Sequence, residues 1–245
     1  MERGTYDRMS RNEDVHWWFA GRRDVIRATI DRLISLPENA RILEAGCGTG
    51  GNLEMLMGLG ELDAFEYDAE ARAIAAEKSC LEIAYGALPN DIPNQDKKYD
   101  LIALFDVLEH IEDDRATLEG LSGYLAGDAR LFVTVPALPW MWSSHDEMHH
   151  HFRRYTKNSL KEVSERAGLE VEYSFYFNSL LFPIAVGLRR FKALFHKETA
   201  DDAMPSDWVN KILYRVFSTE RHFVGRFHAP IGLSVCAILK RKQAG

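Results

Sequence analysis

The chain has 245 residues, of which 46% are hydrophobic, and a formal net charge of −7. This length and hydrophobic content suffice for one complete α/β domain with a modest insertion. The acidic balance and the lack of a basic block argue against a general nucleic-acid-binding role.

Processing and membrane signals are missing from the sequence as given. The three cysteines, Cys47, Cys80 and Cys236, are widely spaced and odd in number, so no disulfide framework is expected. The N-terminus is polar and charged, unlike a signal peptide. No apolar run approaches the roughly 18 residues of a membrane span. We therefore expect a cytoplasmic protein, with peripheral contact at the inner membrane surface left open.

The predicted elements alternate after an N-terminal preface, residues 1–40. Within the preface, His16 to Leu36 combines an aromatic start with an amphipathic helical pattern, and Pro37 ends it. Strands that alternate with helices predict a parallel sheet with helices on both faces. We predict strands at residues 41–45, 62–67, 81–85, 100–106 and 130–135, and helices at residues 51–59, 69–78 and 113–125.

The C-terminal part continues with a helix, two strands and a long insertion. The helix covers residues 156–167, and the strands cover 169–177 and 232–239. About 50 residues, 178–231, separate those strands, which is too long for a hairpin loop and predicts a helical cap. Its amphipathic segments, with arginines and lysines beside apolar stripes, either cover the sheet or face a membrane surface. We expect one domain, 1–245, with its core at 41–177 and 232–240.

The run RILEAGCGTGGN, residues 41–52, predicts a nucleotide-like cofactor. Its glycines let the backbone approach a ligand, and N–H groups at a helix N-terminus point at that ligand. A dinucleotide is one candidate, because Gly46, Gly48 and Gly51 match its pattern and Asp68 follows about 20 residues on. Glu44 favours the other candidate. A carboxylate there repels a pyrophosphate and attracts the sulfonium and ammonium groups of S-adenosylmethionine.

The pattern E-x-G-x-G-x-G, followed by an acid after the second strand, resembles motif I of class I S-adenosylmethionine-dependent methyltransferases. The resemblance implies that Glu44 lies near the methionine part and that Asp68 binds the ribose. It also implies a doubly wound α/β fold with a mostly parallel seven-stranded sheet, an antiparallel last strand, and a helical insertion before that strand.

The same resemblance covers nearly the whole chain and assigns further cofactor contacts. It places Trp18, Phe19 and Arg23 over the cofactor, with the guanidinium suited to the methionine carboxylate. Residues after the third strand hold the adenine, although Ala87 stands where the family often has an acid. The expected cofactor contacts are Trp18, Phe19, Arg23, Glu44, Gly46, Cys47, Gly48, Gly50, Asn52, Tyr67, Asp68, Ala87, Leu88, Phe105 and Asp106.

Two segments are candidates for chemistry. The first, LFDVLEH, resembles the family's segment after strand four, and there His110 either removes a proton from an attacking hydroxyl or makes a structural hydrogen bond. The second, residues 136–160, contains H-x-R-R-Y-T, which resembles bacterial methyltransferases acting on small molecules, sugars or lipid-linked glycans. We expect catalytic roles for His110, His151 and Asp106, and substrate contacts from Trp140, His145, His149, Arg154 and Tyr155.

A divalent metal is possible but not the favoured expectation. Asp106, Glu109 and His110, with one histidine among residues 145–151, are similar to the E-x-x-E-H metal sites of some O-methyltransferases. Metal-free methyltransferases also carry VLEH, and the histidine-rich segment is more simply a flexible lid.

The sequence thus predicts methyl transfer from S-adenosylmethionine to a small-molecule, sugar or lipid-linked acceptor, through an oxygen. An NAD-dependent oxidoreductase and a non-catalytic module that binds a cofactor or docks at a membrane are the alternatives. No nucleic-acid partner is expected.

Overall fold

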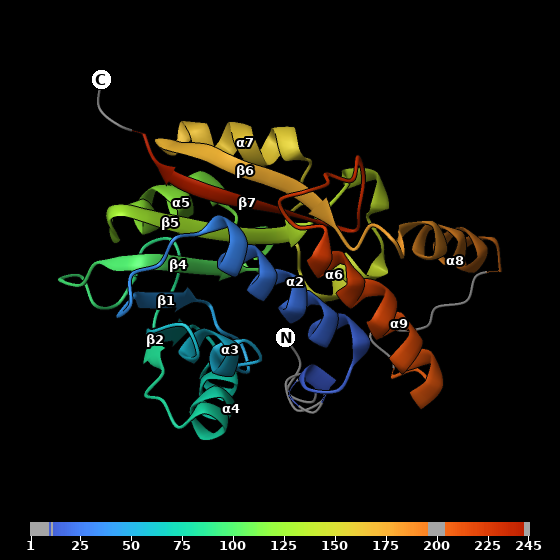
Figure 1. Cartoon of the computed structure of the whole chain (residues 1–245), viewed down its shortest axis with the longest axis horizontal. Helices are drawn as coiled ribbons and strands as arrows, with labels where there is room; N and C mark the ends of the chain where they lie inside the picture. Colours follow the sequence, from blue (N-terminus) through green and yellow to red (C-terminus); the bar gives the residue numbers. More distant parts are fainter. Residues whose placement is uncertain (1–9, 11, 196–203, 243–245) are drawn as a thin grey trace.

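The computed structural model describes residue 10, residues 12–195 and residues 204–242. Within them, seven strands form one sheet in the order β3-β2-β1-β4-β5-β7-β6 (Figure 1). The strands are β1 (Arg41–Ala45), β2 (Glu61–Glu66), β3 (Ala84–Tyr85), β4 (Tyr99–Phe105), β5 (Leu125–Pro136), β6 (Leu169–Phe177) and β7 (Ser234–Arg241).

The predicted fold class is confirmed. Strands β1 to β5 pair in parallel, and β7 lies antiparallel between β5 and β6. Strand β3 is shorter than predicted and pairs with β2 only through Phe65 and Glu66. The chain must then turn closely past β2: a Cβ on Gly86 would lie 2.5 Å from the Phe65 ring.

The helices cover both faces of the sheet. In Figure 1, α2 and α9 lie side by side on one face, and α5 and α7 lie on the other. The helices within the described residues include α2 (Trp17–Leu33), α3 (Leu53–Met57), α4 (Ala69–Ser79), α5 (Asp114–Ser122), α6 (Ser144–Met148), α7 (Lys157–Arg166), α8 (Phe182–Phe195) and α9 (Asp207–Thr219), with short 3-10 turns η1 (Leu108–His110), η2 (Pro139–Met141) and η3 (Glu220–His222).

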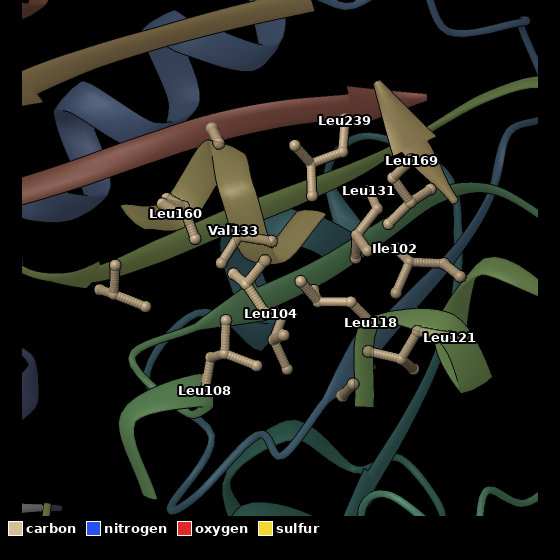
Figure 2. Packing of buried hydrophobic residues seen from close by; sticks show 14 of the residues in the cluster. Ile102, Leu104, Leu108, Leu118, Leu121, Leu131, Val133, Leu160, Leu169 and Leu239 are labelled. Atoms are coloured by element: carbon tan, nitrogen blue, oxygen red, sulfur yellow. The ribbon is translucent and has the colours of Figure 1, made fainter. Parts of the chain in front are cut away.

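Two apolar cores follow from the alternation of side chains along the central strands. Ile102 and Leu104 of β4 face one core, together with residues of α5 and α7 (Figure 2). Leu101 and Ala103 face the other core, together with residues of α2, α3 and α9. Burying one leucine-sized side chain contributes about 1.5–3 kcal/mol, so both layers stabilise the sheet that carries the site.

The helical insertion is fixed to the N-terminal helix. A Cβ on Gly21 of α2 would lie 2.6 Å from Phe217 of α9, so glycine permits the close approach. Asn210 accepts a hydrogen bond from the Trp17 N–H at 2.8 Å, and the Tyr214 hydroxyl donates to Asp24 at 2.9 Å. A helix of the N-terminal preface and a helix of the insertion therefore pack as one layer. Among the described residues, no helix has the length and apolar character to cross a membrane.

Candidate active site

The glycine loop joins β1 to α3 at the carboxyl end of the central strands. Gly46 and Gly48 adopt positive φ angles of 74° and 56°, which glycine adopts without strain. A Cβ on Gly46 would lie 2.9 Å from the Val107 side chain, whereas one on Gly48 would meet nothing within 4 Å. The loop is thus packed on one side and open at Gly48, where a ligand can approach the backbone.

Glu44 is a buried carboxyl group at the end of β1, only 1% exposed. One oxygen accepts a hydrogen bond from Asn52 Nδ2 at 2.8 Å, and Oε2 has no hydrogen-bond partner among the described residues. Burial raises the pKa of Glu44 to about 8. An unpaired buried carboxyl oxygen is costly by itself and suits a cationic ligand group.

Two acids follow β2, and the structure gives them different positions. Asp68 caps α4, because its Oδ1 accepts hydrogen bonds from the N–H groups of Glu70 and Ala71. Glu66 is the acid at the strand end itself, and its two oxygens accept from the N–H groups of Gly48 and Asp68 at 2.8 and 2.9 Å. Glu66, which the sequence analysis did not select, therefore lies against the glycine loop.

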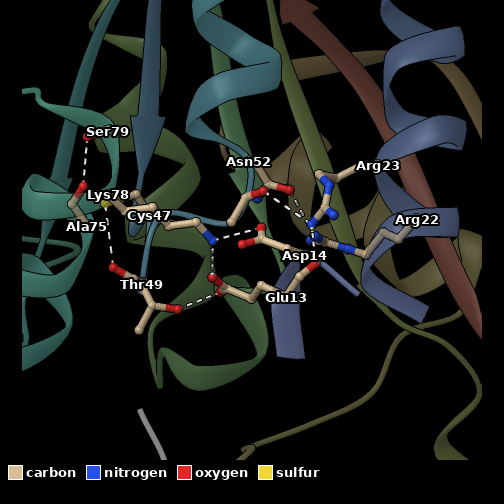
Figure 3. Close-up of polar contacts among 12 residues, drawn as sticks. Glu13, Asp14, Arg22, Arg23, Cys47, Thr49, Asn52, Ala75, Lys78 and Ser79 are labelled. Atoms are coloured by element: carbon tan, nitrogen blue, oxygen red, sulfur yellow. Dashed lines mark hydrogen bonds and ion pairs between the residues drawn. The ribbon is translucent and has the colours of Figure 1, made fainter. Parts of the chain in front are cut away.

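Arg22, rather than the predicted Arg23, is buried in the site (Figure 3). Its Nη2 lies 2.5 Å from the Asp106 carboxylate, and its guanidinium lies over the rings of Trp18 and Phe105. Arg23 instead donates to the backbone carbonyls of Glu13 and Gly51. The i, i+4 spacing of Trp18 and Arg22 on one helical face is the sequence signal that could have identified Arg22.

Asp106 ends β4 in a left-handed conformation, with a φ of 54°. Its N–H donates to the carbonyl of Thr134 on β5 at 2.8 Å. Such a conformation is uncommon for a residue with a Cβ and is often found at functional positions. It brings the Asp106 carboxylate to Arg22 at the strand edge.

Glu13 is a second buried acid that the sequence did not indicate. It lies in the segment before α2, and its Oε1 accepts from the Thr49 hydroxyl at 2.5 Å (Figure 3). Lys78 of α4 lies 3.4 Å from the other oxygen, and a Cβ on Gly51 would collide with the carboxylate. Burial raises the pKa of Glu13. The N-terminal segment is thereby fastened across the glycine loop.

The remaining predicted cofactor contacts surround this loop. Tyr67 is 68% exposed, beside Tyr85 at a ring distance of 6.3 Å. The N–H of Ala87 donates to the Asp91 carbonyl, so it is already used within the turn that contains Leu88. Phe105 and Cys47 are buried in the core, and Phe19 packs edge-on against Trp18. Gly50 also has a positive φ, of 87°.

Three ligating side chains converge beside β4: Glu109, His110 and His151. Glu109 is 1% exposed, and its Oε2 has no hydrogen-bond partner among the described residues. The rings of His110 and His151 are 4.6 Å apart. Burial, helped by the neighbouring histidines, lowers the pKa of His110 to about 3, so this imidazole is neutral at physiological pH.

His151 is held by the fully buried Asp146. Asp146 Oδ1 lies 2.9 Å from His151 Nδ1 and accepts from Arg154 Nε at 2.7 Å. Although burial acts in the opposite direction, the hydrogen bonds from His151 and Arg154 keep the pKa of Asp146 well below its usual value. Because Asp146 engages Nδ1, Nε2 is the ring nitrogen of His151 that remains for a further ligand.

Other residues expected to contact substrate have varied positions. Arg154 and Tyr155 are buried and bind internally, Arg154 to Asp146 and Tyr155 through its hydroxyl to Asp114. Trp140 is exposed on η2. The rings of His145 and His149 lie 4.3 Å apart, close to His151. The segment expected to be a flexible lid is thus anchored by several internal hydrogen bonds, including Phe152 N–H to the Glu109 carbonyl at 2.7 Å.

The sheet order and the glycine loop define a methyltransferase fold of the class I type. Residues 18–174 match the methyltransferase domain family, and the chain belongs to that family. It is a class I S-adenosylmethionine-dependent methyltransferase, as the sequence predicted. Membership of this family favours S-adenosylmethionine over a dinucleotide as the cofactor. No curated protein matches the sequence significantly.

Solved structures are similar in fold at low identity. A complex between the Trm112 methyltransferase activator and a protein described as a methyltransferase, from Haloferax volcanii, matches with a TM-score of 0.64 and 16% identity, covering 99% of this chain and 96% of that one. A TehB-like S-adenosylmethionine-dependent methyltransferase from Corynebacterium glutamicum has a TM-score of 0.59, 19% identity, and coverage of 98% and 97%. The [4+2]-cyclase SpnF has a TM-score of 0.57, 16% identity, and coverage of 91% and 82%. The fold therefore does not define the acceptor.

Proposed function

We propose that the chain transfers the methyl group of S-adenosylmethionine to a hydroxyl oxygen of a small-molecule, sugar or lipid-linked acceptor. One observation supports this above all. The open glycine loop with its buried Glu44 lies at the end of β1, and the cluster of Glu109, His110 and His151 lies at the end of the adjacent β4. In parallel α/β sheets, ligands bind at this edge.

The residues fit the cofactor. The spare oxygen of Glu44 suits its ammonium group, and the open space at Gly48 accommodates a close backbone approach. We assign the ribose hydroxyls to Glu66 instead of Asp68, because Glu66 lies against the glycine loop at the end of β2, whereas Asp68 lies at the start of α4 and caps it. When bound, S-adenosylmethionine supplies an electrophilic methyl group on a sulfonium.

Positioning is the main contribution of the protein, since alignment of the two reactants accounts for much of the rate of a displacement. The acceptor hydroxyl meets the cluster at His110 and His151. His145 and His149 border the cluster and, together with the exposed Trp140 on η2, are the proposed substrate contacts.

Calorimetry and a product assay test this function on the purified full chain. We expect S-adenosylhomocysteine to bind, NADH not to bind, and S-adenosylhomocysteine to form when S-adenosylmethionine is mixed with a hydroxyl acceptor from a panel of phenols, sugars and polyprenyl-linked sugars. Cofactor binding with no turnover on any acceptor supports the non-catalytic alternative. Turnover only with amine or thiol acceptors refutes the choice of oxygen.

We also propose that the cap contacts an anionic membrane surface, which suits a lipid-linked acceptor. Helix α8 extends away from the sheet in Figure 1, and Lys211 and Arg215 are exposed on α9. Apolar side chains beside cationic ones are typical of interfacial helices. Among the described residues of the cap, the exposed large apolar side chains are Leu180, Ile184, Leu188, Met204, Trp208, Ile212, Phe223 and Phe227.

Sedimentation with vesicles of phosphatidylcholine and phosphatidylglycerol tests this surface. We expect the chain to sediment with these vesicles, and the double variant Ile184→Ser/Trp208→Ser to remain in solution. The control Tyr173→Ser removes an aromatic side chain that is 40% exposed on β6, outside the cap, and keeps binding. Failure of the unmodified chain to sediment overturns the membrane contact.

A further inference from the structure

The donor set beside β4 has a composition that methyl transfer alone does not require. Glu109 and His110 come from η1, and His151 comes from the segment between α6 and α7. One ligand atom from each residue lies within 4.8 Å of the other two. Two imidazole nitrogens and one carboxylate oxygen are a ligand set that binds divalent transition metals, with a further position open for water or substrate.

The burial of Glu109 is the second, independent observation. Its Oε2 has no hydrogen-bond partner among the described residues, and the whole side chain is almost completely buried. A buried carboxyl oxygen without a partner is unfavourable unless a proton or a cation satisfies it.

The surroundings of His151 match those of a metal ligand. Asp146 engages Nδ1, which fixes the ring and leaves Nε2 for coordination. Arg154 and the backbone N–H of Ser143 in turn hold Asp146, at 2.7 and 2.9 Å. This buried network thereby fixes the orientation of the His151 imidazole. A histidine that only contacted substrate at the surface would not need such a network.

His110 supplies the second imidazole of the donor set. Its ring centroid lies 4.6 Å from that of His151. An imidazole nitrogen that carries no proton has a lone pair for a metal ion.

We propose that Glu109, His110 and His151 bind one divalent transition metal ion, with Zn²⁺ and Mn²⁺ as the matching probes. Coordination requires the three ligand atoms to approach a common point at about 2.1 Å, which places them about 3.4 Å apart in tetrahedral geometry. In the structure they lie within 4.8 Å of one another, so the side chains must close around the ion. The proposal reverses the sequence-based preference for a metal-free site.

The role of the ion rests on the proposed function, whereas its binding does not. As a Lewis acid, the ion lowers the pKa of the acceptor hydroxyl, whose proton leaves to solvent. The oxygen forms a bond to the methyl carbon while the bond from carbon to sulfur breaks. The electron pair of that bond stays on sulfur and neutralises the sulfonium.

Metal binding is tested without the cofactor. The full chain is treated with a chelator, desalted, and titrated with Zn²⁺ and with Mn²⁺ by calorimetry, and bound metal is measured by elemental analysis. We expect one ion per chain. Co²⁺ substitution should give visible d–d absorption bands, whose intensity reports the coordination number of the bound ion.

Two single variants and one matched control locate the site. Glu109→Gln and His151→Ala should each weaken binding at least about 10-fold. His222→Ala, which removes an exposed histidine on η3, should leave binding unchanged. Thermal melts of the metal-free variants show whether each variant is folded. The metal titration is decisive for a variant whose melting temperature equals that of the unmodified chain.

The outcomes separate this proposal from the proposed function. No metal bound by the folded chain, or binding that both variants leave unchanged, overturns the metal site. In parallel, S-adenosylhomocysteine titrations in chelator measure cofactor binding alone, and their failure contradicts the proposed function whatever the metal result.

Discussion

The guanidinium of Arg22 on α2 lies 2.5 Å from the carboxylate of Asp106 at the end of β4, and Arg22 is 5% exposed. Removing one partner of a buried ion pair leaves the other charge uncompensated, at a cost of about 3–5 kcal/mol. Because the Asp106 side chain keeps some solvent contact, we expect Arg22→Ala to lower the free energy of unfolding by about 3 kcal/mol.

Urea denaturation measures this loss, and Arg27→Ala is the control. Arg27 lies on the same helix and pairs with Asp31, but both side chains are largely exposed, so its removal should cost less than about 1 kcal/mol. Equal losses for the two variants would show that the Arg22 pair is no stronger than a surface pair.

Alanine substitutions at Gly48 and Gly168 distinguish an effect on ligand binding from an effect of backbone strain. Both have positive φ angles, and a Cβ on either meets nothing within 4 Å. Gly48→Ala and Gly168→Ala should therefore each destabilise the fold by about 1–2 kcal/mol. Only Gly48→Ala should weaken S-adenosylhomocysteine binding in calorimetry, because Gly168 follows α7 away from the site. Unchanged affinity in Gly48→Ala would remove the loop from the cofactor site.

Glu44 should couple cofactor binding to pH. Its pKa of about 8 in the folded chain lies above the ordinary value of 4.5, so the unfolded chain loses this proton first as pH rises. Stability from this group is therefore greatest below pH 4.5 and falls up to about pH 8, by at most about 1.4 kcal/mol per pH unit. A cationic ligand favours the ionised form, so binding near pH 7 should release a proton.

Calorimetry in buffers of different ionisation enthalpy detects that proton. Glu44→Gln should abolish the buffer dependence, whereas Glu54→Gln, at an exposed position on α3, should retain it. If the binding enthalpy of the unmodified chain does not depend on the buffer, no proton is released. That result would contradict an un-ionised Glu44 in the ligand-free chain.

Substitutions of Glu66 and of Asp68 should have different effects, one on cofactor affinity and the other on the stability of the fold. Glu66→Gln should lower S-adenosylhomocysteine affinity about 10-fold, which is the size of one lost charged hydrogen bond to ribose. Asp68→Ala should cost about 1 kcal/mol of stability through the lost helix cap and leave affinity nearly unchanged. The reverse pattern would restore Asp68 as the ribose ligand.

The sequence predicted the sheet well because burial dictates its pattern. Alternating strands and helices, and the two faces of β4, follow from apolar residues that must leave water. The glycine loop was equally visible, since its positive φ angles require glycine.

Individual site residues were harder to predict because tertiary packing selects among neighbours. Arg22 and Arg23 are adjacent on a helix, and only the approach of β4 decides which one is buried. Glu66 and Asp68 are only two residues apart, so their spacing from the glycine loop did not distinguish them. The preference of aspartate for helix caps was a signal that could have done so. Glu13 gave no signal, because its partner Thr49 is 36 residues away.

The contact between Gly21 and Phe217 has a consequence for synthesis of the chain. Helix α2 leaves the ribosome about 190 residues before α9, as the separation of Trp17 from Asn210 shows. Until α9 arrives, the face of α2 that Phe217 covers is open to water, and nothing holds the helix that carries Arg22 from that side. The cofactor edge is therefore completed only when the last part of the chain has emerged.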